Sequence, residues 1–327
     1  MKKTLVALVL LVVFALGILT ACTPTVKIDP NKAEYTVGIC QLIQHPALDA
    51  ATEGFKDGLT KALQAEGRTV KFDEQNGQGE PDMCGTIVNT FVAKGVDLIL
   101  ANATARLTAA VSATRNIPIL GTSITDYASA LNIKDWTGVA GGNISGTSDL
   151  APLDKQAEMI VTLFPNAQKV GLLYCSAESN SFYQVNEVAK VLGQKGIETK
   201  EFAFVDTSDI PAVTTAACAW SDVIYVPTDN IVANNVTVID SICSQANTPI
   251  VAGEENICKG CGVATLSIDY YQLGELTGQM AADVLLGKKD ISTLAIATDS
   301  NPTFKFVASR CEKFGITVPS GYQPIEE

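Results

Sequence analysis

The sequence contains few histidines, tryptophans and basic residues. Its 327 residues include one histidine, His45, two tryptophans, and 23 lysines and arginines against 35 acidic residues. A net charge of −12 without a basic cluster argues against nucleic-acid binding. A lone histidine has no second histidine to join it at a metal site. The chain also has no G-x-S-x-G motif and no ATP-binding glycine loop, so a hydrolase would have to use Ser-Lys or carboxylate chemistry without a recognisable motif.

Long apolar runs are absent after the first 20 or so residues. Two lysines precede an apolar run over residues 4–19, which is shorter than the ~20 residues of a membrane-spanning helix and typical of a secretory signal peptide. The letters "LTAC", which end at Cys22, resemble the lipobox of bacterial lipoproteins and imply cleavage before Cys22 and lipidation of its thiol. The alternative is an ordinary cleavage site. We expect a signal peptide over 1–21, a polar tether over 22–33, and a body held by lipid at the outer face of the bacterial cell membrane.

Eight cysteines follow Cys22, and most lie in apolar runs, where a free cysteine behaves as a small hydrophobic residue. Cys258 and Cys261, in "CKGC", form the only close pair. A redox motif and half of a zinc site are both weakly supported, because no second pair and no histidine lie nearby. We favour a local disulfide or two free thiols and expect no metal site.

Strand-like and helix-like segments alternate along the body. Runs such as "VDLILAN", "IPILGTS" and "KVGLLYCS" are apolar throughout and lie between amphipathic helical segments, which indicates parallel sheets covered on both faces. The pattern repeats after "GGNISG". We therefore predict an α/β fold of two doubly wound parallel-sheet lobes joined by a hinge. The first lobe comprises 34–145 plus about 266–290, and the second comprises 146–265. The sequence does not decide which lobe carries 291–327.

Two such lobes direct the carboxyl ends of both sheets towards one crevice, where ligands bind in doubly wound sheets. The loops at these ends carry hydrogen-bonding side chains without a nucleophile–base pair, so we expect binding and no catalysis. We expect no cofactor. The candidate ligand-binding residues are Gln41, His45, Thr104, Ser123, Asp126, Ser179, Asn180, Asp229, Asn230 and Glu254.

Several segments of the chain resemble one known family. "HPALDAATEGF", "ANATARLTAAVSAT", "GGNISGTSDLAPLDKQ" and "GCGVATLSIDYYQLG" together are similar to the substrate-binding lipoproteins of ABC importers, in the tryptophan/tyrosine-binding branch. The resemblance implies a type I periplasmic-binding-protein fold that closes over an aromatic amino acid. It also implies ABC permease and ATPase subunits as partners, and a monomer. Many relatives have proline after the position of Asp126, where this chain has Tyr127.

Some alternatives remain open at this point. The same fold could bind a branched amino acid, a nucleoside or a sugar, or serve as a surface receptor or adhesin. His45 precedes a helix with Pro46 at its first position, so it is either a structural cap or a contact near an amide end suited to a carboxylate. Thr104 and Ser123 could hold the same carboxylate, or act as a cap and a turn.

Two acidic residues compete for the ammonium group of such a ligand. Asp229 ends a buried strand and is either a ligand contact or a turn, and Glu254 is the rival. Ser179 and Asn180 begin a helix and are either caps or contacts made when the lobes close. Candidates for stacking on an aromatic ligand are Tyr127, Phe182 and Tyr183.

Overall fold

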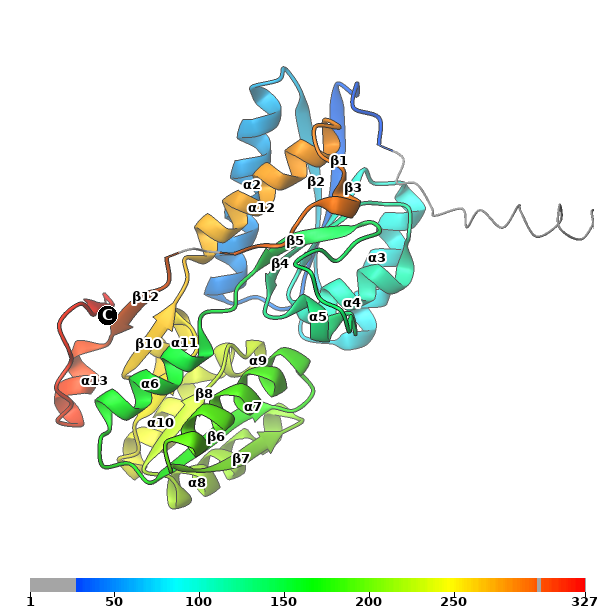
Figure 1. Ribbon diagram of the computed structural model, residues 1–327. Helices are drawn as coiled ribbons and strands as arrows, with labels where there is room; N and C mark the ends of the chain where they lie inside the picture. The colour runs from blue at the N-terminus through cyan, green and yellow to red at the C-terminus, as the bar shows by residue number, and fades with distance from the viewer. Residues whose placement is uncertain (1–27, 299–300, 327) are drawn as a thin grey trace, which may run out of the picture.

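A computed structural model describes residues 28–298 and 301–326, which form two α/β lobes, one above the other in Figure 1. The predicted architecture of two parallel-sheet lobes is confirmed. The expected signal peptide, Cys22 and the first part of the expected tether lie outside the described residues. None of the helices within those residues is long and apolar enough to span a membrane.

The first lobe contains a six-stranded parallel sheet in the order β11-β5-β4-β3-β1-β2. One face is covered by α2 (Pro46–Gln64) and α12 (Tyr270–Leu285), and the other by α3 (Pro81–Lys94), α4 (Thr104–Ala113) and α5 (Tyr127–Ala130). Fully buried strands such as "LILAN" form because both faces are covered. The strands are β1 (Glu34–Gln41), β2 (Thr69–Asn76), β3 (Leu98–Asn102), β4 (Ile119–Ile124), β5 (Ile144–Ser148) and β11 (Ala297–Thr298).

The second lobe contains a seven-stranded sheet in the order β13-β12-β10-β9-β8-β6-β7, in which β12 runs antiparallel to β10. α6 and α7 cover one face, and α8, α9, α10 and α11 cover the other. The strands are β6 (Lys169–Cys175), β7 (Glu198–Phe204), β8 (Val223–Val226), β9 (Ile250–Ala252), β10 (Ala264–Ser267), β12 (Thr303–Phe306) and β13 (Gln323–Pro324). The helices are α6 (Leu153–Leu163), α7 (Ser179–Gln194), η1 (Thr207–Asp209), α8 (Ile210–Trp220), α9 (Asn230–Ala233), α10 (Val236–Ala246) and α11 (Glu255–Cys261), with η2 (Ile291–Thr293) and α13 (Ala308–Lys313) in the C-terminal part.

The chain passes between the two sheets three times, after β5, after β10 and between β11 and β12. The expected lobe boundaries at residues 146 and 266 fall inside β5 and inside β10, and the chain crosses to the other lobe after each of these strands ends. The segment 291–327 contributes strands to both sheets, β11 to the first and β12 and β13 to the second.

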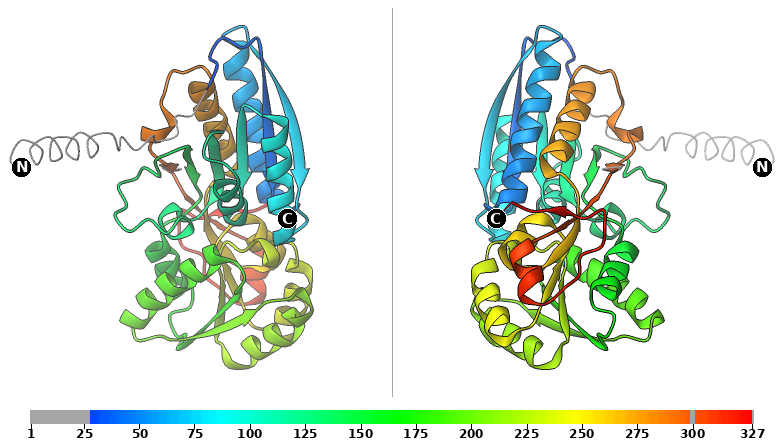
Figure 2. Two further views of the ribbon diagram at one scale, coloured as in Figure 1. Left: turned by 90° about the vertical axis from the view of Figure 1, so that its right-hand side faces the viewer. Right: turned by 90° about the vertical axis from the view of Figure 1, so that its left-hand side faces the viewer.

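Glycines allow α2 and α12 to pack with their backbones in close contact, side by side in both views of Figure 2. A Cβ atom on Gly274 would lie 2.1 Å from the carbonyl oxygen of Ala51, and one on Gly54 would lie 2.0 Å from that of Tyr271. Gly58 and Gly278 are equally crowded by the opposite helix. α12, which follows β10 of the second sheet, is therefore tightly packed against α2 of the first lobe.

Candidate functional site

A cavity lies between the lobes, at the carboxyl ends of both sheets. The first lobe contributes the start of α2 and the end of β4, and the second contributes the starts of α7, α9 and α11. Asp149 and Tyr270 come from the two segments that follow β5 and β10. The lining residues are His45, Ala47, Leu48, Ser123, Thr125, Asp149, Asn180, Thr228, Asp229, Asn230, Ala233, Glu254 and Tyr270.

Six of the ten candidate residues line this cavity: His45, Ser123, Asn180, Asp229, Asn230 and Glu254. The other four do not. Ser179 is exposed, and Asp126 caps α5 by accepting a hydrogen bond from the amide of Ser129 over 2.6 Å. Thr104 is buried outside the lining.

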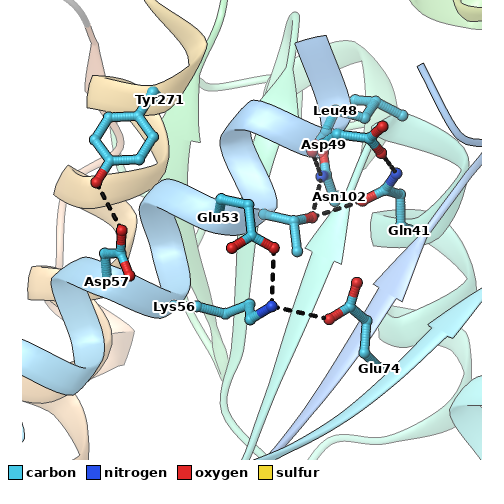
Figure 3. A network of polar contacts seen from close by, with 10 residues as sticks. Gln41, Leu48, Asp49, Glu53, Lys56, Asp57, Glu74, Asn102 and Tyr271 are labelled. Atoms are coloured by element: carbon cyan, nitrogen blue, oxygen red, sulfur yellow. Dashed lines mark hydrogen bonds and ion pairs between the residues drawn. The ribbon is translucent and has the colours of Figure 1, made fainter. Parts of the chain in front are cut away.

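Gln41, the remaining candidate, belongs to a polar network inside the first lobe (Figure 3). Its amide nitrogen donates to Oδ1 of Asp49 over 2.6 Å, and its amide oxygen accepts from the hydroxyl of Thr52 over 2.6 Å. Asn102 donates to the carbonyl of Leu48 over 2.8 Å and to the Thr52 hydroxyl over 2.9 Å. Gln41 therefore fixes the first turns of α2, which in turn present His45 and Leu48 to the cavity.

His45 occupies the N-cap position of α2 in extended conformation, but its side chain does not cap the helix. Its Nε2 lies 3.1 Å from Oδ1 of Asn230, a contact between the lobes. The amide nitrogen of Asn230 donates to Glu178 over 2.7 Å, so its oxygen faces His45 and Nε2 carries the proton. Burial lowers the pKa of His45. The neutral ring therefore leaves Nδ1 as an acceptor, and no described residue bonds to it.

Asp229 and Glu254 are buried carboxylates whose oxygens are largely occupied. Asp229 accepts from the amide of Cys175 over 2.7 Å, from the hydroxyl of Ser181 over 2.8 Å, and from the amide of Val232 over 2.8 Å, where it caps α9. Glu254 caps α11. Burial raises the pKa of Asp229 to about 8 and that of Glu254 to about 7, and for Asp229 the nearby charge of Glu178 adds to the effect. Both carboxylates therefore have structural roles as well as a place in the cavity wall.

Asp149 is the lining carboxylate with an oxygen left open. Its Oδ2 accepts from the hydroxyl of Tyr270 over 2.9 Å, whereas Oδ1 is buried and has no hydrogen-bond partner among residues 28–298 and 301–326. Burial raises its pKa to about 6, although polar contacts with Tyr270 and Thr125 oppose this. Neither residue was among the sequence-based candidates. Both follow strands at the points where the chain changes sheet, which is the signal that could have identified them.

Ser123 and Ala103 show backbone strain at the cavity end of the first sheet. Their φ angles are 55° and 95°, in a region that residues with a Cβ rarely adopt. Such strain is concentrated at binding and active sites. The hydroxyl of Ser123 is buried and makes no hydrogen bond within the described part of the chain, so it is free for a ligand.

The aromatic side chains considered for stacking lie elsewhere. Tyr127 is in the core of the first lobe, where its hydroxyl donates to the carbonyl of Thr147 over 3.2 Å. Phe182 is 52% exposed, and Tyr183 packs on the core of the second lobe. The aromatic ring in the cavity lining is that of Tyr270.

Cys258 and Cys261 lie within α11 and are free, as are the other described cysteines. The described residues contain no cluster of three or more side chains suited to a metal ion.

Comparisons with known proteins agree with this geometry. A family model described as ABC transporter substrate binding protein matches residues 36–321. The chain is 33% identical to a tyrosine-binding protein from Clostridioides difficile, over 88% of this chain and 85% of that protein. It matches a structure from Streptococcus pneumoniae in complex with L-Trp with a TM-score of 0.84 and 30% identity, over 89% of this chain and all of that one.

A third relative, described as open, matches this chain less closely in shape. The ligand-free, open structure of a substrate-binding protein with adhesive properties from Clostridium difficile matches with a TM-score of 0.67 and 30% identity, over 89% of this chain and 99% of that one. At equal identity the liganded structure is the closer match in shape. Together with the bond between His45 and Asn230, this indicates that the two lobes are in the closed arrangement.

Proposed function

Because the chain belongs to the ABC transporter substrate-binding protein family, we propose that it captures an amino acid with an aromatic side chain for import. Members of this family are extracytoplasmic and bind solutes. The choice of ligand rests on two relatives at 30–33% identity: one is described as a tyrosine-binding protein, and the other is a structure in complex with L-Trp. Tryptophan, tyrosine and phenylalanine are the candidates. Another small solute, such as a branched amino acid, a nucleoside or a sugar, is the alternative.

Closure of the lobes is the proposed mechanism of capture. In an open form the side chains of the two lobes would be too far apart to contact one ligand. A ligand that bonds to both lobes binds the closed form more tightly and therefore shifts the population towards it. The permease and ATPase of an ABC importer would then take up the ligand from the closed form.

For the ligand's ammonium group we propose Oδ1 of Asp149 and Nδ1 of His45 as acceptors. Both atoms are buried in the cavity wall without partners among the described residues, and a buried polar group without a partner is costly. An ammonium group supplies several donors and a positive charge, which suits an ionised carboxylate beside a neutral imidazole. Asp229 and Glu254 line the same cavity, but their own oxygens are already bonded, so we do not propose them as direct acceptors.

For the ligand's carboxylate we propose the first turn of α2 and the hydroxyl of Ser123. α2 has 19 residues, and Ala47 and Leu48 in its first turn line the cavity. Amide groups at a helix start and the helix dipole favour an anion. The ligand would then lie with its carboxylate against the first lobe and its ammonium group towards the segment that carries Asp149.

The ligand's side chain would contact the apolar part of the lining. Ala47, Leu48 and Ala233 supply small apolar surfaces, and Tyr270 supplies the aromatic face. Aromatic pairs gain about 0.5–1.5 kcal/mol beyond the area that they bury. These surfaces suit a flat aromatic side chain, and the many polar residues of the lining are left for the ligand's charged groups.

We further propose that Cys22 is lipidated after removal of residues 1–21 and that the mature chain acts as a monomer on the outer face of the membrane. The lipobox-like "LTAC" supports the anchor. A second role in surface adhesion is suggested by the relative that is described as having adhesive properties.

Thermal unfolding of protein stripped of bound ligand tests the proposed ligand class. A ligand that binds only the folded state at a hundredfold excess over its Kd adds about 2.7 kcal/mol of stability. We expect millimolar tryptophan, tyrosine or phenylalanine to raise the Tm, and glucose or a nucleoside to leave it unchanged. A shift with the sugar alone would overturn the proposal.

A further inference from the structure

Two cysteines on neighbouring helices of the second lobe face each other. Sγ of Cys218, on α8, lies 3.5 Å from Sγ of Cys243, on α10, although 25 residues separate them in sequence. α8 and α10 pack on the same face of the second sheet as α11 does. Neither cysteine lines the ligand cavity.

The two thiols differ in access to solvent. Cys243 is 2% exposed, whereas Cys218 is partly exposed and borders a surface groove between α8 and α10 that includes Thr215 and Gln245. The hydrogen bond between the two thiols lowers the pKa of Cys218 to about 7. The same bond, followed by burial and the charge of Cys218, raises the pKa of Cys243. A partly exposed cysteine with a lowered pKa is the reactive kind, because the thiolate is the nucleophile.

We propose that Cys218 and Cys243 form an oxidisable pair that closes to a disulfide in the extracytoplasmic environment of this protein family. Disulfides persist in oxidising compartments. Bond formation needs the sulfurs to approach from 3.5 Å to about 2.05 Å.

The oxidant would be a small-molecule or protein disulfide. The Cys218 thiolate attacks one sulfur of that disulfide and releases its first thiolate, which leaves a mixed disulfide on Cys218. The Cys243 thiol then loses its proton, attacks Sγ of Cys218 and releases the second thiolate. Two protein thiols are oxidised and one external disulfide is reduced to two thiols.

Oxidised glutathione is the probe for a direct test on the reduced, purified mature protein. We expect two of the eight described cysteines to become unreactive to a thiol reagent, with the mass lowered by two hydrogen atoms and a peptide that links Cys218 to Cys243. We also expect Cys218 to react with iodoacetamide at pH 7 about tenfold faster than the buried thiols, since a larger fraction of it is thiolate. Retention of all eight thiols, or a link between other cysteines, would overturn the proposal.

Single variants test the order of the two steps. In Cys243→Ser the mixed disulfide between Cys218 and glutathione should accumulate, because no second thiol resolves it. In Cys218→Ser the buried Cys243 should stay reduced. Cys311→Ser is the matched control, since Cys311 is buried in a different cluster and should leave the Cys218–Cys243 link unchanged. Oxidation should also raise the Tm by several degrees and leave ligand affinity unchanged, because the pair lies outside the cavity.

Discussion

The hydroxyl of Tyr270 donates to Oδ2 of Asp149 over 2.9 Å and so joins two of the three segments that connect the lobes. Oδ1 of Asp149 has no hydrogen-bond partner among the described residues, and Asp149 lines the cavity. Asp149 therefore takes part in a contact between two connecting segments and is also the group proposed to bind the ligand's ammonium.

Asp149→Asn is expected to weaken binding of an aromatic amino acid by about 2–5 kcal/mol, because the ligand's ammonium group would lose its buried anion. The unliganded protein should fold normally, since the variant removes a buried charge and keeps the shape. Titration calorimetry with tryptophan, tyrosine and phenylalanine is the measurement. Asp126→Asn is the control, as Asp126 caps α5 outside the cavity.

A ligand without the ammonium group sharpens that test. 3-Phenylpropionate should bind the wild type weakly and lose little further affinity in Asp149→Asn. If Asp149→Asn binds phenylalanine as tightly as the wild type does, the ammonium group is held elsewhere, and Asp229→Asn is the next variant to measure.

His45→Ala is expected to reduce affinity by about 1–3 kcal/mol, the range for a lost hydrogen bond at a buried site. The variant removes both the contact with Asn230 and the open Nδ1 acceptor. Gln44→Ala, at the exposed neighbouring position, should bind as the wild type does. Equal affinities for both variants would show that His45 serves only to start α2.

The unliganded protein should become more stable as the pH falls from about 8 to about 7. The pKa values of Asp229, at about 8, and Glu254, at about 7, lie above those of an unfolded chain, so the folded state binds more protons in this window. Their stabilising contribution is complete at low pH and is lost as the pH rises through these values. The lowered pKa of Cys218, at about 7, opposes this trend in part between pH 7 and 8, and the lowered pKa of His45 opposes it nearer its ordinary value of about 6.5. Urea unfolding at several pH values is the measurement, and a flat profile would contradict the assignment.

Ligand affinity should depend on pH in the opposite direction. Asp149 must be ionised to hold an ammonium group, and its pKa is about 6 before the ligand binds. Calorimetry should show affinity falling as the pH drops below about 6, and this fall should disappear in Asp149→Asn.

Gly274→Ala is expected to destabilise the protein by about 1–3 kcal/mol, the usual cost of overpacking. Its Cβ would meet the backbone of α2 at Ala51, which cannot rotate away. Gly193→Ala is the matched control, because Gly193 lies in α7 with open space around it and should gain about 0.5–1 kcal/mol of helix propensity. Equal unfolding midpoints for the two variants would contradict the close packing of α2 and α12.

The regular alternation of apolar strands and amphipathic helices made the two lobes predictable, because each strand is buried on both faces and is therefore apolar throughout. The same pattern located the loops at the sheet ends and thus His45 and Asp229. It could not separate side chains that face the cavity from those that cap a helix, and Asp229 and Glu254 do both.

Other features depend on contacts between distant parts of the chain. Gln41 looked like a cleft residue, but its amide is bonded to Asp49 and Thr52 in the next helix. Asp149 belongs to no recognisable motif, and only its position after β5, where the chain crosses between the sheets, marks it. The short β11 and β13 carry too few residues for a periodic signal.

The three crossings between the sheets also bear on how the protein is made. The part of the chain after residue 269 supplies α12 and β11 to the first lobe and β12 and β13 to the second. While the polypeptide emerges from a ribosome or an export channel, neither sheet has its final edge strand until nearly the whole chain has emerged. A product that stops before residue 297 would therefore expose an open strand edge on both lobes at once, at β5 and at β10, and open edges invite pairing with other chains. We therefore expect such a fragment to be degraded by proteases, because neither lobe would have its complete sheet.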